Sequence, residues 1–113
     1  MREIKFRAWQ TERKEMIPHE RISNIGMLIN YEYEHAIPLE YIGTSDKNNK
    51  DIYEGDIVKC ANGKIKVVKY FRNYGRFACS NNFNQDMLPM IIVNFGSTEV
   101  IGNIYENPKL LSN

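Results

Sequence analysis

Residues 41–58 constrain the fold most, because a short apolar run, a polar turn and a second apolar run follow one another there. The apolar run at 39–43 predicts a strand. Residues 44–50 predict a turn, since their Ser, Asp and Asn side chains can bond to nearby backbone groups. Residues 53–56 (YEGD) then lead directly into a second predicted strand. The segment therefore predicts two strands and the connection between them.

Strand and turn signals continue through much of the chain. Residues 2–17 predict a hairpin, because Ile4, Phe6 and Ala8 recur with the two-residue period of a half-buried strand. Residues 57–61 and 64–71 flank an Asn-Gly pair at 62–63. Asn-Gly between two such runs is the strongest short-range hairpin signal, since both residues accept positive φ. The turn at 73–75 then predicts a returning strand at 76–80.

Three segments are less regular. Residues 22–33 have helix-like apolar spacing, but Gly26 and the alternation of Tyr31 and Tyr33 favour a loop followed by a strand. We expect loops at 35–38 and at 81–88, the latter exposed and mobile.

The end of the chain predicts one more hairpin and a helical turn. Residues 90–95 and 98–105 are strand-like runs on either side of Gly-Ser at 96–97, and an Asn-Pro helix start predicts one turn at 108–111. Strands and tight turns thus dominate, which argues against a parallel α/β sheet. We expect a mainly β protein, an antiparallel sheet curled into a small, partly open barrel with at most short helical turns, in a single domain spanning 1–113.

Nothing in the composition indicates a membrane or a secreted protein. No run reaches the roughly 18 apolar residues of a membrane span, and the N-terminus carries charges where a signal peptide needs an apolar region. We therefore expect a cytoplasmic protein. In that reducing compartment Cys60 and Cys79 should be small buried residues, and His19 and His35 lie too far from them in sequence to complete a metal site. We expect no metal and no cofactor.

Three blocks of sequence stand at the start, middle and end of the chain: residues 1–9 (MREIKFRAW), 41–58 (YIGTSDKNNKDIYEGDIV) and 99–108 (EVIGNIYENP). Together they resemble the YopX-like family of phage and prophage proteins. The family usually has Asp in place of Gln10 and Asn-Gly in place of Asn48-Asn49, and Asn keeps the turn possible because it tolerates the left-handed conformation. The resemblance implies a β-rich, phage-encoded protein of unassigned activity in the cytoplasm of the bacterial host. It supplies no catalytic residue.

The acidic residues of the middle block suggest two kinds of chemistry and one structural role. Residues 46–57 superficially match a calcium loop, but Lys50, Asp51 and Ile57 stand where such a loop needs an oxygen ligand, a glycine and a glutamate. Glu54 and Asp56 could line one strand face as paired carboxylates for acid–base catalysis. Alternatively, Asp56 bonds turn amides while Glu54 is solvated, and we favour this structural role. We therefore expect no catalytic residue and a turn-building role for a set of six residues: Asp46, Asn48, Asn49, Gly55, Asp56 and Gly63.

Charge is unevenly distributed, although the net charge is only +1. Residues 17–58 carry eight acidic and three basic side chains, a net charge of −5. Residues 59–76, called the basic segment below, carry six basic side chains and no acidic one. The two parts could attract each other within the fold or between subunits, and the basic segment could also meet an acidic partner.

Residues 64–77 (KIKVVKYFRNYGRF), which overlap the basic segment, form a candidate nucleic-acid surface. Basic side chains could follow phosphates while aromatic ones stack on bases. The candidates are Lys64, Lys66, Lys69, Tyr70, Arg72, Tyr74 and Arg76. Against this, one strand face would mix charged with bulky side chains, and the isoelectric point near 7.7 is far below that of strongly basic domains. We therefore expect a non-enzymatic accessory protein that forms a homo-oligomer or binds an unknown phage or host protein, with nucleic-acid binding as the alternative and no membrane contact.

Overall fold

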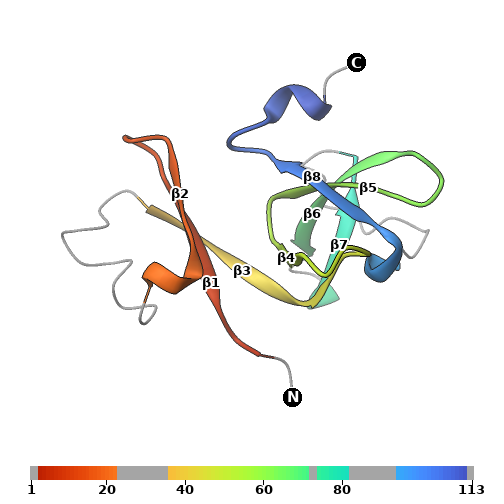
Figure 1. The fold of residues 1–113 in the computed structure, drawn as a ribbon, viewed down its shortest axis with the longest axis horizontal. Helices are drawn as coiled ribbons and strands as arrows, with labels where there is room; N and C mark the ends of the chain where they lie inside the picture. The colour runs from red at the N-terminus through yellow and green to blue at the C-terminus, as the bar shows by residue number, and fades with distance from the viewer. Residues whose placement is uncertain (1–2, 23–35, 72–73, 82–93, 112–113) are drawn as a thin grey trace.

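Two four-stranded antiparallel sheets and three short 3-10 turns make up the part of the chain that the structure describes (Figure 1). The structure is a computed structural model, and it describes residues 3–22, 36–71, 74–81 and 94–111. The sheet orders are β2-β1-β3-β4 and β7-β6-β5-β8, and one of the two sheets curls into an open half-barrel. The predicted mainly β fold with short helical turns and a partly open barrel is therefore confirmed.

The first sheet contains the predicted N-terminal hairpin. Its strands are β1 (Phe6–Gln10), β2 (Glu15–Ile17), β3 (Ala36–Ser45) and β4 (Asp51–Tyr53). A 3-10 turn, η1 (His19–Arg21), follows the hairpin. The predicted apolar face is only partly buried, because Ile4, which precedes β1, is 72% exposed while Ala8 in β1 is fully buried.

The strand β3 is longer than the sequence predicts. Residues 36–38, expected to form a loop, pair with β1, and Pro38 stands opposite Ala8. A proline is tolerated there because β4 pairs with β3 only between Tyr41 and Ser45, so among the described strands β3 is an edge strand at Pro38.

The second sheet contains the hairpin that Asn62-Gly63 predicts, with a different turn. Its strands are β5 (Asp56–Lys59), β6 (Ile65–Phe71), β7 (Arg76–Ser80) and β8 (Glu99–Asn103). Gly63 takes a φ of 86° and donates its N–H to the Cys60 carbonyl at 2.9 Å, but Asn62 does not take a positive φ. The Asn62 side chain instead accepts the Lys64 N–H at 3.0 Å. The hairpin is therefore present as predicted, but of the two turn residues only Gly63 takes the left-handed conformation.

Of the last hairpin expected around residues 96–97, the structure describes the turn and the second strand, and residues 90–93 lie outside the described residues. Phe95–Ser97 form a 3-10 turn, η5, which the Asn94 side chain closes by accepting the Gly96 N–H at 3.0 Å. The following strand, β8, pairs with β5, for example Val100 with Val58. The closing turn is confirmed as a 3-10 turn, η6 (Pro108–Leu111).

The predictions for residues 23–33 and 82–88, and the strand expected at 90–93, lie outside the described residues. No helix in the described ranges is long and apolar enough to cross a membrane.

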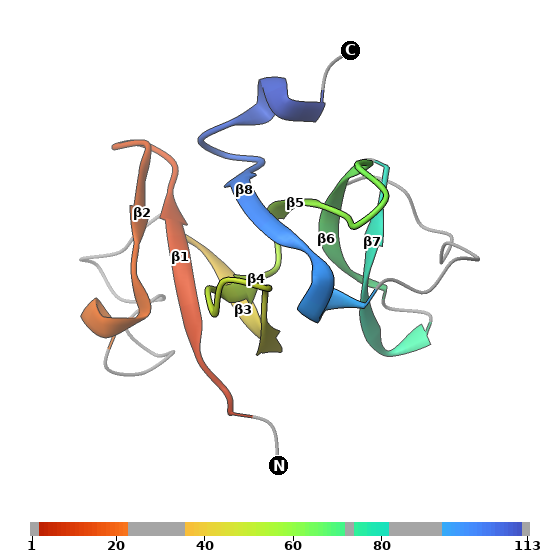
Figure 2. The same cartoon turned by 45° about the vertical axis from the view of Figure 1, so that its right-hand side comes forward.

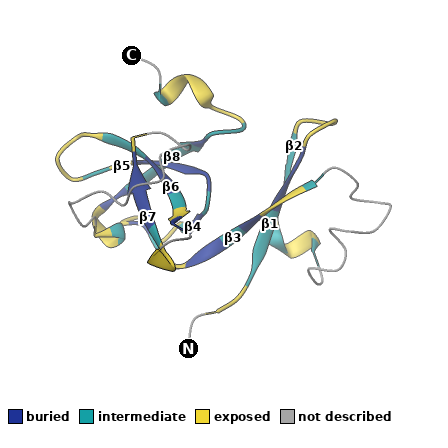
Figure 3. Cartoon of the chain, turned by 180° about the vertical axis from the view of Figure 1, so that it is seen from behind, coloured by how far each residue is buried: buried dark blue, intermediate teal, exposed yellow. Residues whose placement is uncertain are grey.

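One hydrophobic core connects the two sheets. Ile42, Ile52, Val58, Val68 and Cys79 form it, and they come from β3, β4, β5, β6 and β7. Burial of a large aliphatic side chain contributes about 1.5–3 kcal/mol. The β1–β2 hairpin and the β6–β7 pair lie at opposite ends of the molecule (Figure 2). Most buried positions lie on the strands, whereas the turns are mainly exposed (Figure 3).

Gly102 allows η6 to lie against β8. A Cβ at this position would stand 2.6 Å from Asn107 Oδ1 and 2.9 Å from Leu110 Cδ1. Gly102 does not take a positive φ, so the constraint is space and not backbone conformation. Asn107 in turn accepts the Asn103 N–H on the same Oδ1, at 3.2 Å. The closing turn is therefore held where only a glycine fits.

We predict that Gly102→Ala lowers the free energy of unfolding by about 1–3 kcal/mol, because the added methyl group must displace Asn107 and Leu110. Urea unfolding measures the loss, and amide chemical shifts report whether η6 moves. Gly96→Ala is the control, since its Cβ would meet Asn94 Oδ1 at 3.3 Å, the end of an exposed side chain. Equal stability losses in the two variants would contradict the prediction.

Candidate functional site

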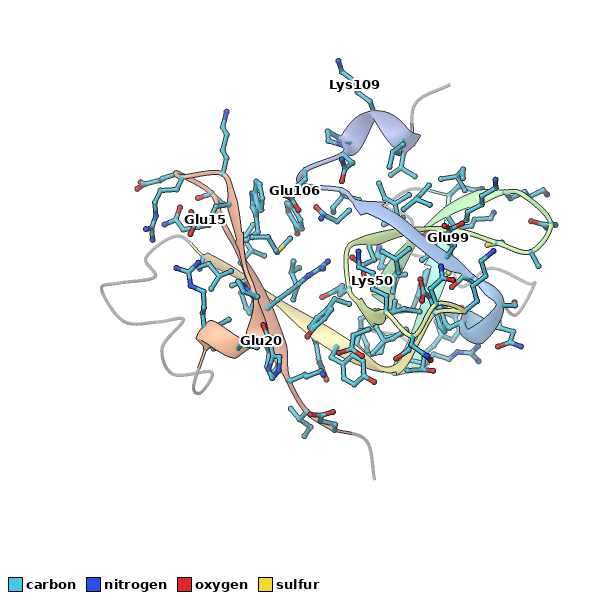
Figure 4. The ribbon with its side chains drawn as sticks, viewed as in Figure 1. Glu15, Glu20, Lys50, Glu99, Glu106 and Lys109 are labelled. Atoms are coloured by element: carbon cyan, nitrogen blue, oxygen red, sulfur yellow. The ribbon has the colours of Figure 1, made fainter. Side chains whose placement is uncertain are left out.

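One face of β1 joins the start of the chain to its middle and end. The two-residue period of a strand places Lys5, Arg7 and Trp9 on the same face, and each contacts a residue far away in sequence. Lys5 Nζ lies 2.7 Å from Asp51 Oδ2, and the Trp9 ring stacks on Tyr105 with a centroid distance of 5.5 Å. Side chains fill the space between β1 and the second sheet (Figure 4). We call these contacts, together with the Arg7–Asp56 pair, the seam. The seam is where the three sequence blocks meet.

The Arg7–Asp56 ion pair lies at the centre of the seam. Asp56 is 1% exposed, and its Oδ1 lies 2.5 Å from Arg7 Nη2. Its Oδ2 accepts the Tyr53 N–H at 2.8 Å, and the Arg7 guanidinium lies over the Tyr53 ring, 4.7 Å from its centroid. Burial raises the pKa of Asp56, and the Arg7 charge and the Tyr53 N–H offset part of that rise. Both carboxylate oxygens are therefore engaged within the chain.

Glu54 and Asp56 do not form the carboxylate pair that their spacing suggested. Glu54 lies in the turn between β4 and β5, so the alternation of a strand does not apply to it. Its Oε2 accepts the Tyr70 N–H at 3.4 Å, whereas Asp56 points to Arg7 and Tyr53. Glu54 is also half-buried and not solvated as expected, and burial raises its pKa. Gly55 between them takes a φ of 90°.

The Asp46 carboxylate organises the 44–50 turn and ties it to β8. Its Oδ1 accepts the N–H groups of Asn48 and Lys50 at 2.8 and 2.9 Å, and its Oδ2 accepts the Val100 N–H at 2.8 Å. Burial by itself would raise the pKa of Asp46, but these backbone donors outweigh it and the pKa is lowered. Asn49 takes the left-handed conformation, with a φ of 64°. Backbone N–H groups thus occupy the oxygens that a calcium loop would offer.

The cysteines and histidines form no metal site in the described ranges. No group of three or more His, Cys, Asp and Glu side chains that could hold a metal ion occurs there. Cys79 is buried, which raises its pKa to about 12, and Cys60 is half-buried. A thiol with so high a pKa is unreactive at neutral pH. His19 lies 3.9 Å from Glu20, and His35 is outside the described residues.

The candidate nucleic-acid residues divide into separate groups. Lys64 and Lys66 lie at the start of β6, Tyr70 lies at its far end, and Val68 between them is fully buried in the core. Lys69 projects from the opposite strand face, with Nζ 5.5 Å from the Phe71 ring centroid. The strand is therefore not one continuous open platform. Arg72 lies outside the described residues.

The far end of β6 carries exposed aromatic side chains. Tyr70 is 41% exposed and Tyr74 is 53% exposed. The Tyr70 ring meets Phe77 edge to face, with a centroid distance of 5.0 Å. Arg76, the first residue of β7, is exposed and stands opposite Phe71, so the alternation of β7 places its side chain on the other sheet face from Phe77. This group, Tyr70, Tyr74, Phe77 and Arg76, is called the aromatic end below.

The start of β6 forms part of a cavity of about 550 Å³. Lys64, Ile65 and Lys66 line it together with three residues that the sequence analysis did not single out, Asn81, Leu110 and Leu111. Lys66 Nζ lies 2.5 Å from Asn81 Oδ1. We call it the Lys64–Leu111 cavity. No local signal could reveal it, because its walls come from segments distant in the sequence.

Comparison with known proteins identifies a family and a fold. The YopX protein family matches residues 5–112, nearly the whole chain. The crystal structure of protein EF1440 from Enterococcus faecalis is similar, with a TM-score of 0.66 and 26% sequence identity, over 99% of this chain and 100% of that one. No curated protein matches the chain.

We predict that Asp56→Ala destabilises the protein by about 3–5 kcal/mol, because it leaves the Arg7 guanidinium buried without its counter-charge. The double variant Arg7→Met/Asp56→Leu should recover most of that loss, since it removes both charges. Urea unfolding of each variant measures the free energies.

Lys5→Met is the control for this cycle. Its partner Asp51 is 39% exposed, so losing the pair should cost about 1 kcal/mol or less. An Asp56→Ala variant no less stable than Lys5→Met would show that the buried pair is not the centre of the seam.

Proposed function

We propose that this chain, which belongs to the YopX protein family over nearly its whole length, is an accessory protein of a phage or prophage. We propose further that it acts by binding and not by catalysis. The observation that carries this proposal is that the acidic side chains are bound to other groups of the same chain. In the middle block, Asp46, Asp51 and Asp56 all bind backbone N–H groups or basic side chains of the same chain. Groups engaged in this way hold the fold and are not available as acids or bases.

The basic segment supports a binding role. In the described ranges, Lys59, Lys64, Lys66 and Arg76 form no ion pair with a carboxylate of this chain. Of the acidic residues at 17–58, Asp46, Asp51 and Asp56 already bind backbone N–H groups or basic side chains of other segments. An uncompensated basic surface attracts a partner with an acidic surface. We infer that this partner is a second copy of this chain, which would offer the exposed carboxylate of Glu20. The alternative partner is an acidic phage or host protein.

We predict that the protein self-associates and that Lys59→Glu/Arg76→Glu weakens this association about tenfold or more, since each reversal removes an attraction and adds a repulsion. Sedimentation equilibrium at low and high salt measures the effect. Arg13→Glu/Lys14→Glu is the control, because these exposed residues make the same charge change in the β1–β2 turn. A wild-type protein that stays at 13.3 kDa at high concentration and low salt would contradict the homo-oligomer.

Nucleic-acid binding is the second candidate, and the aromatic end favours it. Tyr70 and Tyr74 expose ring surface on which unpaired bases could stack, and Arg76, exposed at the start of β7, could meet a phosphate. The separate placement of Lys64 and Lys66 limits such a surface to a few nucleotides. A single-stranded ligand fits this arrangement better than a duplex, because stacking needs exposed base faces.

We predict that labelled oligothymidine binds at about 50 mM salt and that affinity falls steeply as salt increases. Tyr70→Ala and Tyr74→Ala should each weaken binding about tenfold, the value of one stacked base. Fluorescence anisotropy measures the affinity. Ile37→Ala, which changes an exposed apolar residue on β3, is the control. Absence of binding at low salt would exclude this function.

A further inference from the structure

The Lys64–Leu111 cavity brings together two basic side chains and an aliphatic wall. Lys64, Ile65 and Lys66 come from the start of β6, Asn81 follows β7, and Leu110 and Leu111 come from η6. A volume of about 550 Å³ is within the range of small-molecule sites. The hairpin, the sheet edge and the closing turn therefore form a concavity of suitable size for a ligand.

The positive charges of the cavity have no counter-charge in the described part of the chain. Neither Lys64 nor Lys66 forms an ion pair with a carboxylate there. Lys66 donates to the neutral Asn81 Oδ1, which satisfies a hydrogen bond without neutralising the charge. Two residues apart on an extended chain, the lysines stand about 6.5 Å apart at their Cα atoms, so their ammonium groups can converge on one head group. A dianionic phosphate suits two lysines, and lysine is a common phosphate ligand.

The opposite wall is aliphatic and held in place before any ligand arrives. Leu110 and Leu111 supply it, Leu110 is 41% exposed, and Ile65 adds apolar surface between the two lysines. The close approach of η6 to Gly102 fixes the position of this wall. Among the described residues, no aromatic side chain lines the cavity, so these residues offer no stacking surface for a base. An aliphatic group of a ligand would bury leucine surface that is now in contact with water.

We propose that the Lys64–Leu111 cavity binds an organic phosphate with a short aliphatic chain. The phosphate meets Lys64 and Lys66, and the aliphatic chain lies on Leu110 and Leu111. The inference rests on the proposed function in that the chain acts by binding, and it names a ligand class for a surface apart from the aromatic end.

The test is a titration of the whole chain with three probes: hexyl phosphate, inorganic phosphate and adenosine monophosphate. Amide chemical shifts in NMR spectra report both the affinity and the place of binding. We expect hexyl phosphate to bind saturably, at least tenfold more tightly than the other two, and to shift the amides of residues 64–66 and 110–111. Lys64→Gln and Lys66→Gln should each weaken it about tenfold, the value of a charge-assisted hydrogen bond.

Two further variants separate the two parts of the site. Leu110→Ser should weaken hexyl phosphate binding several-fold and leave inorganic phosphate unchanged, because only the aliphatic chain contacts it. Lys109→Gln is the matched control, since Lys109 is on the same turn but points away from the molecule (Figure 4), and it should bind as the wild type does. Should Lys66→Gln fail to fold, Lys64→Gln still decides the question, because Lys64 is exposed.

Three outcomes would overturn the inference. They are no saturable binding of hexyl phosphate at about 10 mM, equal losses in Lys109→Gln and Lys64→Gln, and tighter binding of adenosine monophosphate than of hexyl phosphate. Self-association is measured separately by sedimentation. A protein that self-associates but does not bind hexyl phosphate would contradict this inference alone. A protein that binds hexyl phosphate but stays monomeric would contradict the homo-oligomer alone.

Discussion

The buried ion pair between Arg7 and Asp56 is the interaction on which the arrangement of the two sheets depends. It connects β1 to the first residue of β5, and Asp56 also holds the Tyr53 N–H of the preceding strand. Removing two charges from water is costly, so such a pair stabilises a fold only when both members and their hydrogen bonds are in place. The register of β1 then aligns Lys5 with Asp51 and Trp9 with Tyr105. Lys5, Arg7 and Trp9 thus hold the N-terminal hairpin on the rest of the fold through two ion pairs and one ring stack.

The same contacts explain the uneven charge of the surface. Asp46, Asp51 and Asp56 contribute to the negative net charge of residues 17–58. In the fold, however, Asp46 binds backbone N–H groups, Asp51 binds Lys5 and Asp56 binds Arg7. In the described ranges, Lys59, Lys64, Lys66 and Arg76 of the basic segment form no ion pair with a carboxylate. The fold therefore engages these three carboxylates internally and leaves Lys59, Lys64 and Arg76 exposed on the surface. A protein built in this way presents positive charge at both ends of β6, and the two ends differ in the apolar surface beside them.

Much of the fold could be predicted because it depends on local chemistry. The hairpin at 62–63, the turn at 44–50 and the closing turn at 108–111 each follow from residues that satisfy their own backbone groups. The errors share a different cause. Pro38 joins a strand because β4 pairs elsewhere, and Glu54 lies in a turn that removes it from the face of Asp56. Each of these depends on which strands become neighbours, and no short stretch of sequence contains that information.

By itself, the sequence determined the fold class, the positions of the tight turns and the membership of the YopX protein family, since these depend on residue types and spacings along the chain. Only the tertiary structure decided what the charged residues do. It made Arg7 the partner of a buried carboxylate, and it divided one basic stretch between a cavity and an aromatic end. The physical reason is that burial and counter-charge are set by residues distant in the sequence. Asp56 meets Arg7 across 49 positions, and Lys64 lies in one cavity with Leu111 only because the chain folds back.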